Sequence, residues 1–229
     1  MTNNTFKNIV LITSVINTSN NPYSYCDVRS VFNSTERLQQ TLFTIKSARD
    51  KIPDCKIILS ECSHLSTDFE DILKNTVDYY CNLKNIKEVY DAVNGKCKAL
   101  GEICIQKYTL IILKNLNLQF DNLFKISGRY IFSNKFNYQP FDNDKICFRK
   151  LTEVEGECAV TMYKIPYKSI KDFYEYLVGD VCKNLTDQIQ SYEFIFGKFI
   201  SMQNEHVLKE FSHIGIKGII AVHGGLADQ

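Results

Sequence analysis

The sequence predicts an α/β fold with a mostly parallel central sheet flanked by helices. Two short and almost entirely apolar runs, Asn8–Thr13 and Cys55–Glu61, are typical of strands that are covered on both faces. Helical patterns lie between and after them, and this alternation favours a doubly wound sheet with right-handed crossovers. The length of 229 residues suits one such domain, so we expect a single domain over 1–229.

The first half of the chain reads as strand, helix, strand, helix, helix, strand. In the first helix, apolar residues recur at helical spacing and Asn33 or Ser34 can cap the start. Thr67-x-x-Glu70 predicts a capping box for the second helix. The expected segments in this half, after the strand Asn8–Thr13, are the helix Ser34–Asp50, the strand Cys55–Glu61, a helix from Thr67, the helix Lys98–Leu113 and the strand Leu123–Phe132.

The second half mixes shorter elements. We expect strands over Lys145–Lys150, Ala159–Lys164 and Gly215–Val222, and helices over Ser169–Val178, Thr186–Met202 and Val207–Phe211.

Composition excludes several classes of protein. The net charge is +1 with no basic cluster, which argues against a nucleic-acid partner. The longest apolar run, Tyr108–Leu113, is too short to span a membrane, and the N-terminus lacks a signal peptide, so we expect a cytoplasmic protein. Nine cysteines without any Cys-x-x-Cys pair indicate reduced core thiols rather than a metal site.

Ligands of open α/β sheets bind beyond the carboxyl ends of the strands, and the strand Leu123–Phe132 carries unusual charge there. Side chains alternate along a strand, so Lys125, Ser127 and Arg129 share one face, with Gly128 allowing close approach of a ligand. Charged side chains on such a strand must be paired with an opposite charge, exposed to solvent, or in contact with an anionic ligand. A diphosphate would satisfy the hydrogen-bond donors of Arg129. The alternative is an edge strand with a solvated face and an Arg–Glu pair.

Three other residues are candidates for the same site. Lys98 stands at the start of a predicted helix, just after Asn94–Lys96, and a helix N-terminus with nearby lysines attracts phosphate. The alternative is that this segment is an ordinary solvated loop. Glu193 falls within an apolar helical stripe. A carboxylate there is either a base in a pocket or a structural group paired with a cation. His223 lies beside glycines near the end of the sequence, either at the acceptor side of the site or as an ordinary surface or core residue.

Several of these segments together resemble a known family. Val10–Ser14, Ser34–Arg49 and Ile57–Ser63 look like the start of a GT-A (Rossmann-like) glycosyltransferase domain. The segments Lys98-x-x-Gly101-Glu102 and Lys125–Tyr130 are similar to those of small GT-A-like enzymes of bacterial surface polysaccharides and large DNA viruses. The resemblance implies transfer of a sugar from a nucleotide-sugar donor to a glycan or lipid-linked acceptor.

The resemblance also implies roles for parts of the chain. Residues 1–132 would bind the nucleotide sugar, and residues 133–229 would form the acceptor and catalytic part. Glu193 resembles the general base of inverting members. The implied donor-binding residues are Thr13, Ser14, Arg37, Glu61, Lys98, Lys125, Ser127, Gly128, Arg129 and Tyr130.

The chain departs from the family at the metal-binding motif. GT-A enzymes usually carry Asp-x-Asp where this chain has Ser127-Gly128-Arg129-Tyr130, and Asp121 has no partner Asp. The departure argues against dependence on Mn²⁺ or Mg²⁺. The hypothesis is that Arg129, with Lys125, neutralises the leaving diphosphate instead.

Two rival functions remain open at this point. A nucleotidyltransferase of sugar metabolism would use the same sheet and cations, but it usually needs metal-binding carboxylate pairs. A non-catalytic interaction protein would retain only the fold.

Overall fold

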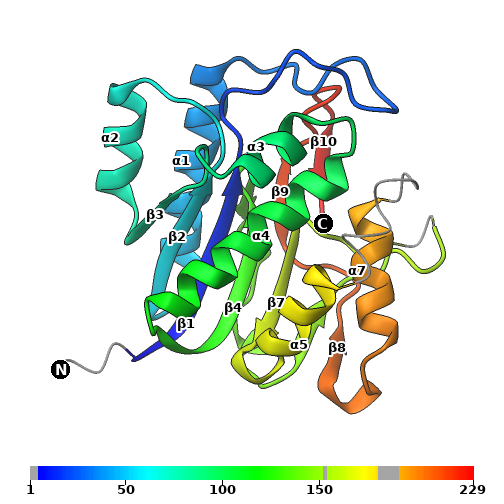
Figure 1. Cartoon of the computed structure of the whole chain (residues 1–229). Helices are drawn as coiled ribbons and strands as arrows, with labels where there is room; N and C mark the ends of the chain where they lie inside the picture. Colours follow the sequence, from blue (N-terminus) through cyan, green and yellow to red (C-terminus); the bar gives the residue numbers. More distant parts are fainter. Residues whose placement is uncertain (1–4, 152–153, 180–190) are drawn as a thin grey trace.

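The computed structural model describes residues 5–151, 154–179 and 191–229 and shows the expected α/β architecture (Figure 1). Its main sheet has seven strands in the order β3-β2-β1-β4-β7-β6-β8. The strands are β1 (Thr5–Ser14), β2 (Cys55–Glu61), β3 (Tyr79–Asn82), β4 (Gln119–Ser127), β6 (Ile146–Phe148), β7 (Met162–Pro166) and β8 (Leu208–Glu210). Only β7 is antiparallel to its neighbours in this sheet, so the predicted fold class is confirmed.

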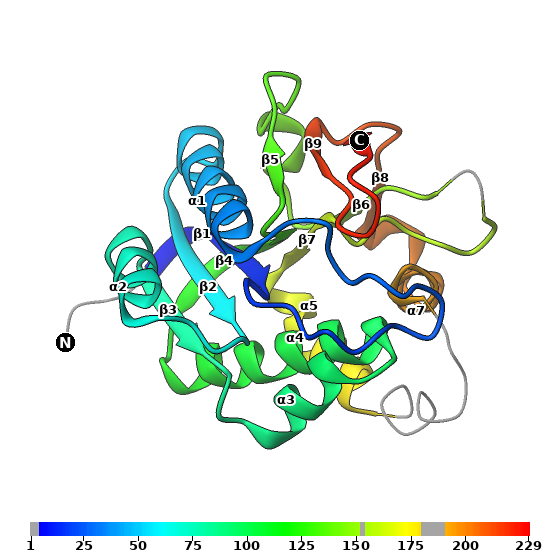
Figure 2. The same ribbon diagram turned by 90° about the horizontal axis from the view of Figure 1, so that it is seen from above.

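Helices cover both faces of the main sheet, as the view from above shows (Figure 2). The helices α1 and α2 lie on one face and α3, α4 and α5 on the other. Their bounds are α1 (Ser34–Lys51), α2 (Thr67–Thr76), α3 (Lys87–Asn94), α4 (Lys98–Asn115), α5 (Tyr167–Val178) and α7 (Tyr192–Ser201), with 3₁₀ turns at Gln139–Phe141 and Glu205–Val207.

The alternation of side chains along β1 divides the interior into two cores. Ile9 and Leu11 pack into the core under α4, α5 and α7, whereas Val10 and Ile12 pack into the core under α1. All four side chains are at most 1% exposed, which explains why this strand lacks a polar face.

A second, three-stranded sheet lies beside the main one, in the order β10-β9-β5. Its strands are β5 (Tyr130–Phe132), β9 (Ile216–Ile219) and β10 (Leu226–Asp228). The predicted strand Leu123–Phe132 is therefore wrong as one continuous element. It ends at Ser127, and a turn at Gly128 and Arg129 sends the chain into the second sheet. The amide of Gly128 donates to the carbonyl of Thr13 at 3.0 Å, so the turn is fixed against β1.

Other expected elements also differ from the structure. Ser66, rather than Thr67, is the N-cap of α2, and its hydroxyl accepts from the amide of Phe69 at 3.4 Å. Glu70 does not complete a capping box, because its carboxylate pairs with Lys74 and Lys84. Val207–Phe211 contains the strand β8 rather than a helix, and the short elements β3 and α3 were not expected. The first part of the predicted helix Thr186–Met202 lies outside the described residues.

The described residues contain no helix that is both long and apolar enough to cross a membrane. Their cysteines form no disulfide, and five of the eight are buried.

Candidate functional site

A cavity of about 640 Å³ opens at the carboxyl ends of β1 and β4. The loop 15–33 crosses above these strand ends and forms part of its wall (Figures 1 and 2). The first turns of α4 and α7 and the segment after β9 complete the wall. The volume is within the usual range for the binding site of a small organic ligand.

The cavity brings together all but three of the residues predicted from sequence. Those that line it are Thr13, Ser14, Arg37, Lys98, Lys125, Ser127, Arg129, Tyr130 and Glu193. Five cationic side chains and two carboxylates are among the described lining residues, so the cavity carries an excess of positive charge.

Arg129 is a cation of this cavity whose charge the described residues leave unpaired. Its Nε atom is buried without a hydrogen-bond partner, and no ion pair involves its guanidinium within the described ranges. The turn after β4 aims this side chain at the cavity, because the amide of Arg129 donates to the carbonyl of Ser127 at 2.8 Å. A half-buried guanidinium without a partner favours an anionic ligand.

Arg37 and Lys98 respond electrostatically to this cation. Burial and the charge of Arg129 lower the pKa of Arg37 to about 10, and its Nε donates to the carbonyl of Val15 at 2.8 Å. The protein around Lys98 and the charge of Arg129 likewise lower the pKa of the Lys98 ammonium, although its side chain reaches solvent at the cavity mouth. Arg129 thus repels both of the other cations, and a bound polyanion would stabilise all three.

Lys125, by contrast, is already paired. It is 1% exposed and its ammonium lies 2.8 Å from Oε1 of Glu102 on α4. It also donates to the hydroxyl of Ser127 at 3.0 Å and to the carbonyl of Val160 at 2.7 Å. The alternative interpretation, an edge strand with a solvated face and an Arg–Glu pair, is therefore wrong, because β4 lies between β1 and β7 and the ion pair joins Lys125 to Glu102.

Glu102 was not predicted as a site residue. Burial alone would raise the pKa of its carboxyl, but Lys125, the Thr13 hydroxyl and the charge of Lys98 lower that pKa below its usual value. A signal was present in the sequence: Lys98, Glu102 and Gln106 recur at helical spacing in the first, largely apolar half of this helix.

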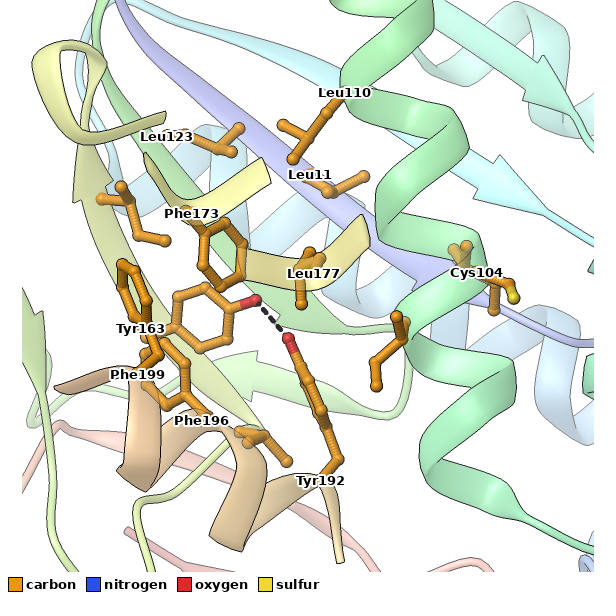
Figure 3. Close-up of a cluster of buried hydrophobic side chains, with 14 of the residues drawn as sticks. Leu11, Cys104, Leu110, Leu123, Tyr163, Phe173, Leu177, Tyr192, Phe196 and Phe199 are labelled. Carbon is orange, nitrogen blue, oxygen red and sulfur yellow. Dashed lines mark hydrogen bonds between the residues drawn. The ribbon is translucent and has the colours of Figure 1, made fainter. Parts of the chain in front are cut away.

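A buried polar network continues from Glu102 toward α7. Nε2 of Gln106 donates to Oε1 of Glu102 at 3.3 Å, and the hydroxyls of Tyr163 and Tyr192 both donate to Oε1 of Gln106. Figure 3 shows these two hydroxyls pointing toward each other, 3.1 Å apart, inside an aromatic cluster. Because Tyr192 directly precedes Glu193, this network fixes the start of α7 relative to the floor of the cavity.

Glu193 lies in the first turn of α7 and is half-buried at the cavity wall. The turn is capped by Ser191, whose hydroxyl accepts from the amide of Phe194 at 3.0 Å. The charge of Glu193 acts on the cavity, because it partly offsets the lowering of the Lys98 pKa.

Glu61, Gly128 and His223 do not line the cavity. Glu61 is fully buried, and its Oε1 accepts from the amides of Ile16 and Ser63 at 3.1 and 2.8 Å, which shapes the turn after β2. A Cβ on Gly128 would lie 3.3 Å from the carbonyl of Thr13, so this glycine allows the turn to approach β1. His223 is exposed and its Nδ1 accepts from the amide of Gly225 at 3.0 Å, although the preceding Val222 does reach the cavity.

Sequence reasoning also missed the aromatic side chains of the loop 15–33. The rings of Tyr23 and Tyr25 stack with centroids 5.5 Å apart, and the guanidinium of Arg29 lies 4.2 Å from the Tyr23 ring. Arg29 also donates to the carbonyls of Val93, Asn94 and Gly95, which ties this loop to the turn between α3 and α4. The closely spaced tyrosines in a polar loop were the available signal.

The segment that the sequence resemblance assigns to the metal motif lacks the oxygen ligands that a divalent cation prefers. Ser127, Gly128 and Arg129 offer a hydroxyl and a cation there, while Asp121 is exposed near the opposite end of β4. Within 5–151, 154–179 and 191–229, no group of three or more His, Cys, Asp or Glu side chains is placed to hold a metal.

No family profile and no curated protein sequence matches the chain. Among solved structures, the apo-form glycosyltransferase GlyE of Streptococcus pneumoniae TIGR4 is similar to it with a TM-score of 0.52 and 10% identity. That similarity covers 90% of this chain and 45% of GlyE, so the chain spans less than half the length of that protein. The galactosyltransferase LgtC, solved with donor and acceptor sugar analogs, has a TM-score of 0.52 at 9% identity, over 88% of this chain and 72% of LgtC. At these identities the likeness establishes the fold, which is that of GT-A-like glycosyltransferases.

Proposed function

We propose that this protein is a glycosyltransferase that moves a sugar from a nucleotide-sugar donor to a glycan or lipid-linked acceptor. In this proposal residues 1–132 bind the donor and residues 133–229 complete the acceptor and catalytic side. The observation that carries it is the uncompensated Arg129 guanidinium beside Arg37 and Lys98 in a cavity at the strand ends. Such a cluster suits the diphosphate of a nucleotide sugar.

The proposed reaction proceeds with inversion. The carboxylate of Glu193 takes the proton from an acceptor hydroxyl as that oxygen attacks the anomeric carbon of the donor. The bond between the anomeric carbon and the diphosphate oxygen breaks, and the nucleoside diphosphate leaves with the electron pair. Arg129 stabilises the negative charge that develops on it, the role that a divalent cation has in Asp-x-Asp enzymes.

A thermal-shift screen against nucleoside diphosphates and their sugar conjugates, with EDTA or with Mn²⁺, tests donor binding. We expect stabilisation by one nucleotide and its sugar conjugate in EDTA, and its loss in Arg129→Ala. Arg149→Ala is the matched control, because Arg149 is another half-buried arginine with a partnerless Nε but does not line the cavity. Stabilisation that requires Mn²⁺ would refute the role of Arg129 in place of a metal. No response to any nucleotide would favour an interaction protein, and release of pyrophosphate from a nucleoside triphosphate would favour a nucleotidyltransferase.

A second experiment addresses Glu193. The variant Glu193→Gln should lower the transfer rate by about 100-fold or more while the Kd for the donor stays unchanged. Glu175→Gln, which changes an exposed carboxylate on α5, should retain the wild-type rate. Wild-type transfer by Glu193→Gln would exclude this residue as the base.

A further inference from the structure

We propose that Glu102 recognises the transferred sugar of the donor, by accepting a hydrogen bond from a sugar hydroxyl on its Oε2 atom. This inference rests on the proposed function and adds the residue that distinguishes a nucleotide sugar from the nucleotide alone.

The two oxygens of Glu102 have different surroundings. Oε1 faces three donors: the Thr13 hydroxyl at 3.0 Å, the Lys125 ammonium at 2.8 Å and the Gln106 amide at 3.3 Å. Oε2 accepts from none of the residues that the structure describes. Oε2 is also not one of the buried polar atoms that lack a partner, so part of its surface is accessible. With 21% of this side chain exposed and the residue lining the cavity, Oε2 is the oxygen available to a ligand.

The surrounding contacts hold this carboxylate in one orientation. Thr13 ends β1, Lys125 lies on β4, and Gln106 is one helical turn further along α4, so donors from three elements converge on one oxygen. Gln106 is itself held by the hydroxyls of Tyr163 and Tyr192. A carboxylate fixed in this way pays little entropy when Oε2 binds a further donor.

The chemistry of the site selects the kind of partner. Glu102 is ionised, because its pKa is lowered, and an ionised carboxylate only accepts hydrogen bonds. It would repel the phosphates that the cations attract, so its partner is a neutral group that carries hydrogen-bond donors. A donor sugar is attached directly to the diphosphate and offers several hydroxyls. Ribose offers hydroxyls too, and an experiment that compares nucleotides with and without the sugar separates these two sources.

The test is isothermal titration of wild type and Glu102→Gln with UDP, UDP-glucose, UDP-galactose, GDP and GDP-mannose. For the nucleotide that binds, the ratio of the diphosphate Kd to the sugar-conjugate Kd measures the contribution of the sugar. We expect Glu102→Gln to reduce this ratio by about tenfold, the size of one charge-assisted hydrogen bond, while the Kd of the diphosphate changes less than about threefold. Glu88→Gln is the control, because Glu88 is a lysine-paired carboxylate that does not line the cavity.

Glu102→Gln leaves Lys125 without its carboxylate and can impair folding. The double variant Glu102→Gln/Lys125→Met avoids an unpaired buried charge and should show the same reduced ratio. An unchanged ratio in whichever of the two variants folds would overturn the role of Glu102 alone. An equal loss for the diphosphate and its conjugate would also overturn it, because the carboxylate would then act on ribose or only position Lys125. Failure of the wild type to bind any nucleoside diphosphate of the thermal-shift screen would instead remove the proposed function, and this inference with it.

Discussion

At the scale of single residues, the sequence marks the site but does not say which charges are compensated. Lys125 and Arg129 stand out as cations on an apolar strand, and both line the cavity. Their states differ because Lys125 meets Glu102 from α4, whereas the turn at Gly128 carries Arg129 away from that carboxylate. This ion pair forms because a helix and a strand that are distant in sequence pack together. The spacing of residues along the sequence therefore cannot predict it.

The pair of Lys125 and Glu102 predicts a pH-dependent effect on stability. Because the folded-state pKa of Glu102 lies below its ordinary value of 4.5, its ionised form stabilises the fold above about pH 4.5, and this contribution is lost as the pH falls through the lower folded-state pKa. We expect Glu102→Gln to reduce the free energy of unfolding by about 3 kcal/mol at neutral pH and by clearly less near pH 3. Urea denaturation followed by circular dichroism at several pH values measures the difference. A cost that is independent of pH would contradict the ionised pair.

At the scale of elements, the long helices and buried strands were predictable and the short ones were not. The helix α1 begins at its predicted residue, since Asn33 and Glu36 form a capping box. The strand β3 and the helix α3 have only 4 and 8 residues, too few for a periodic pattern to separate them from a loop. The break after Ser127 was missed because apolar residues keep the same two-residue period before and after Gly128, as in Ile126 and Tyr130. Only the neighbouring β1 determines that Gly128 turns.

The packing of α7 against Gly156, in the segment between β6 and β7, gives a second prediction. A Cβ built on Gly197 would lie 1.8 Å from the backbone carbonyl oxygen of Gly156, which no side-chain movement can relieve. We expect Gly197→Ala to lower the free energy of unfolding by about 2 kcal/mol or more, despite the higher helix propensity of alanine. The control is Lys198→Ala on the exposed side of the same helix, which should change stability by less than about 0.5 kcal/mol. Equal stability of the two variants in chemical denaturation would show that this close approach is not tight.

At the scale of the whole molecule, the described cavity lining has an excess of positive charge that the sequence as a whole lacks. The net charge is +1, yet the described cavity lining carries five cationic groups against two carboxylates. Polyanions bind through many surface contacts, whereas a small diphosphate needs only the cavity.

We therefore expect that the protein does not retard a single-stranded RNA of about 20 nucleotides in a gel-shift assay at about 0.15 M salt. The assay uses protein concentrations at which binding of a nucleoside diphosphate is saturated. Retardation that disappears when UDP is added would place the nucleic acid in the cavity and contradict this expectation. Retardation that UDP does not affect would show a basic surface elsewhere.

The turn that carries Arg129 also joins β4 of the main sheet directly to β5 of the small one. The guanidinium therefore stands at a joint between two sheets, one holding the ends of β1 and β4 and the other extending to β9 and β10. A ligand bound to this side chain would restrain the joint. We expect the restraint to extend to β9, which pairs with β5, and to β10, which pairs with β9. Under the proposed function, amides of β9 and β10 would exchange with solvent more slowly when the nucleotide is bound, so the state of the cavity could be read from strands that never touch the nucleotide.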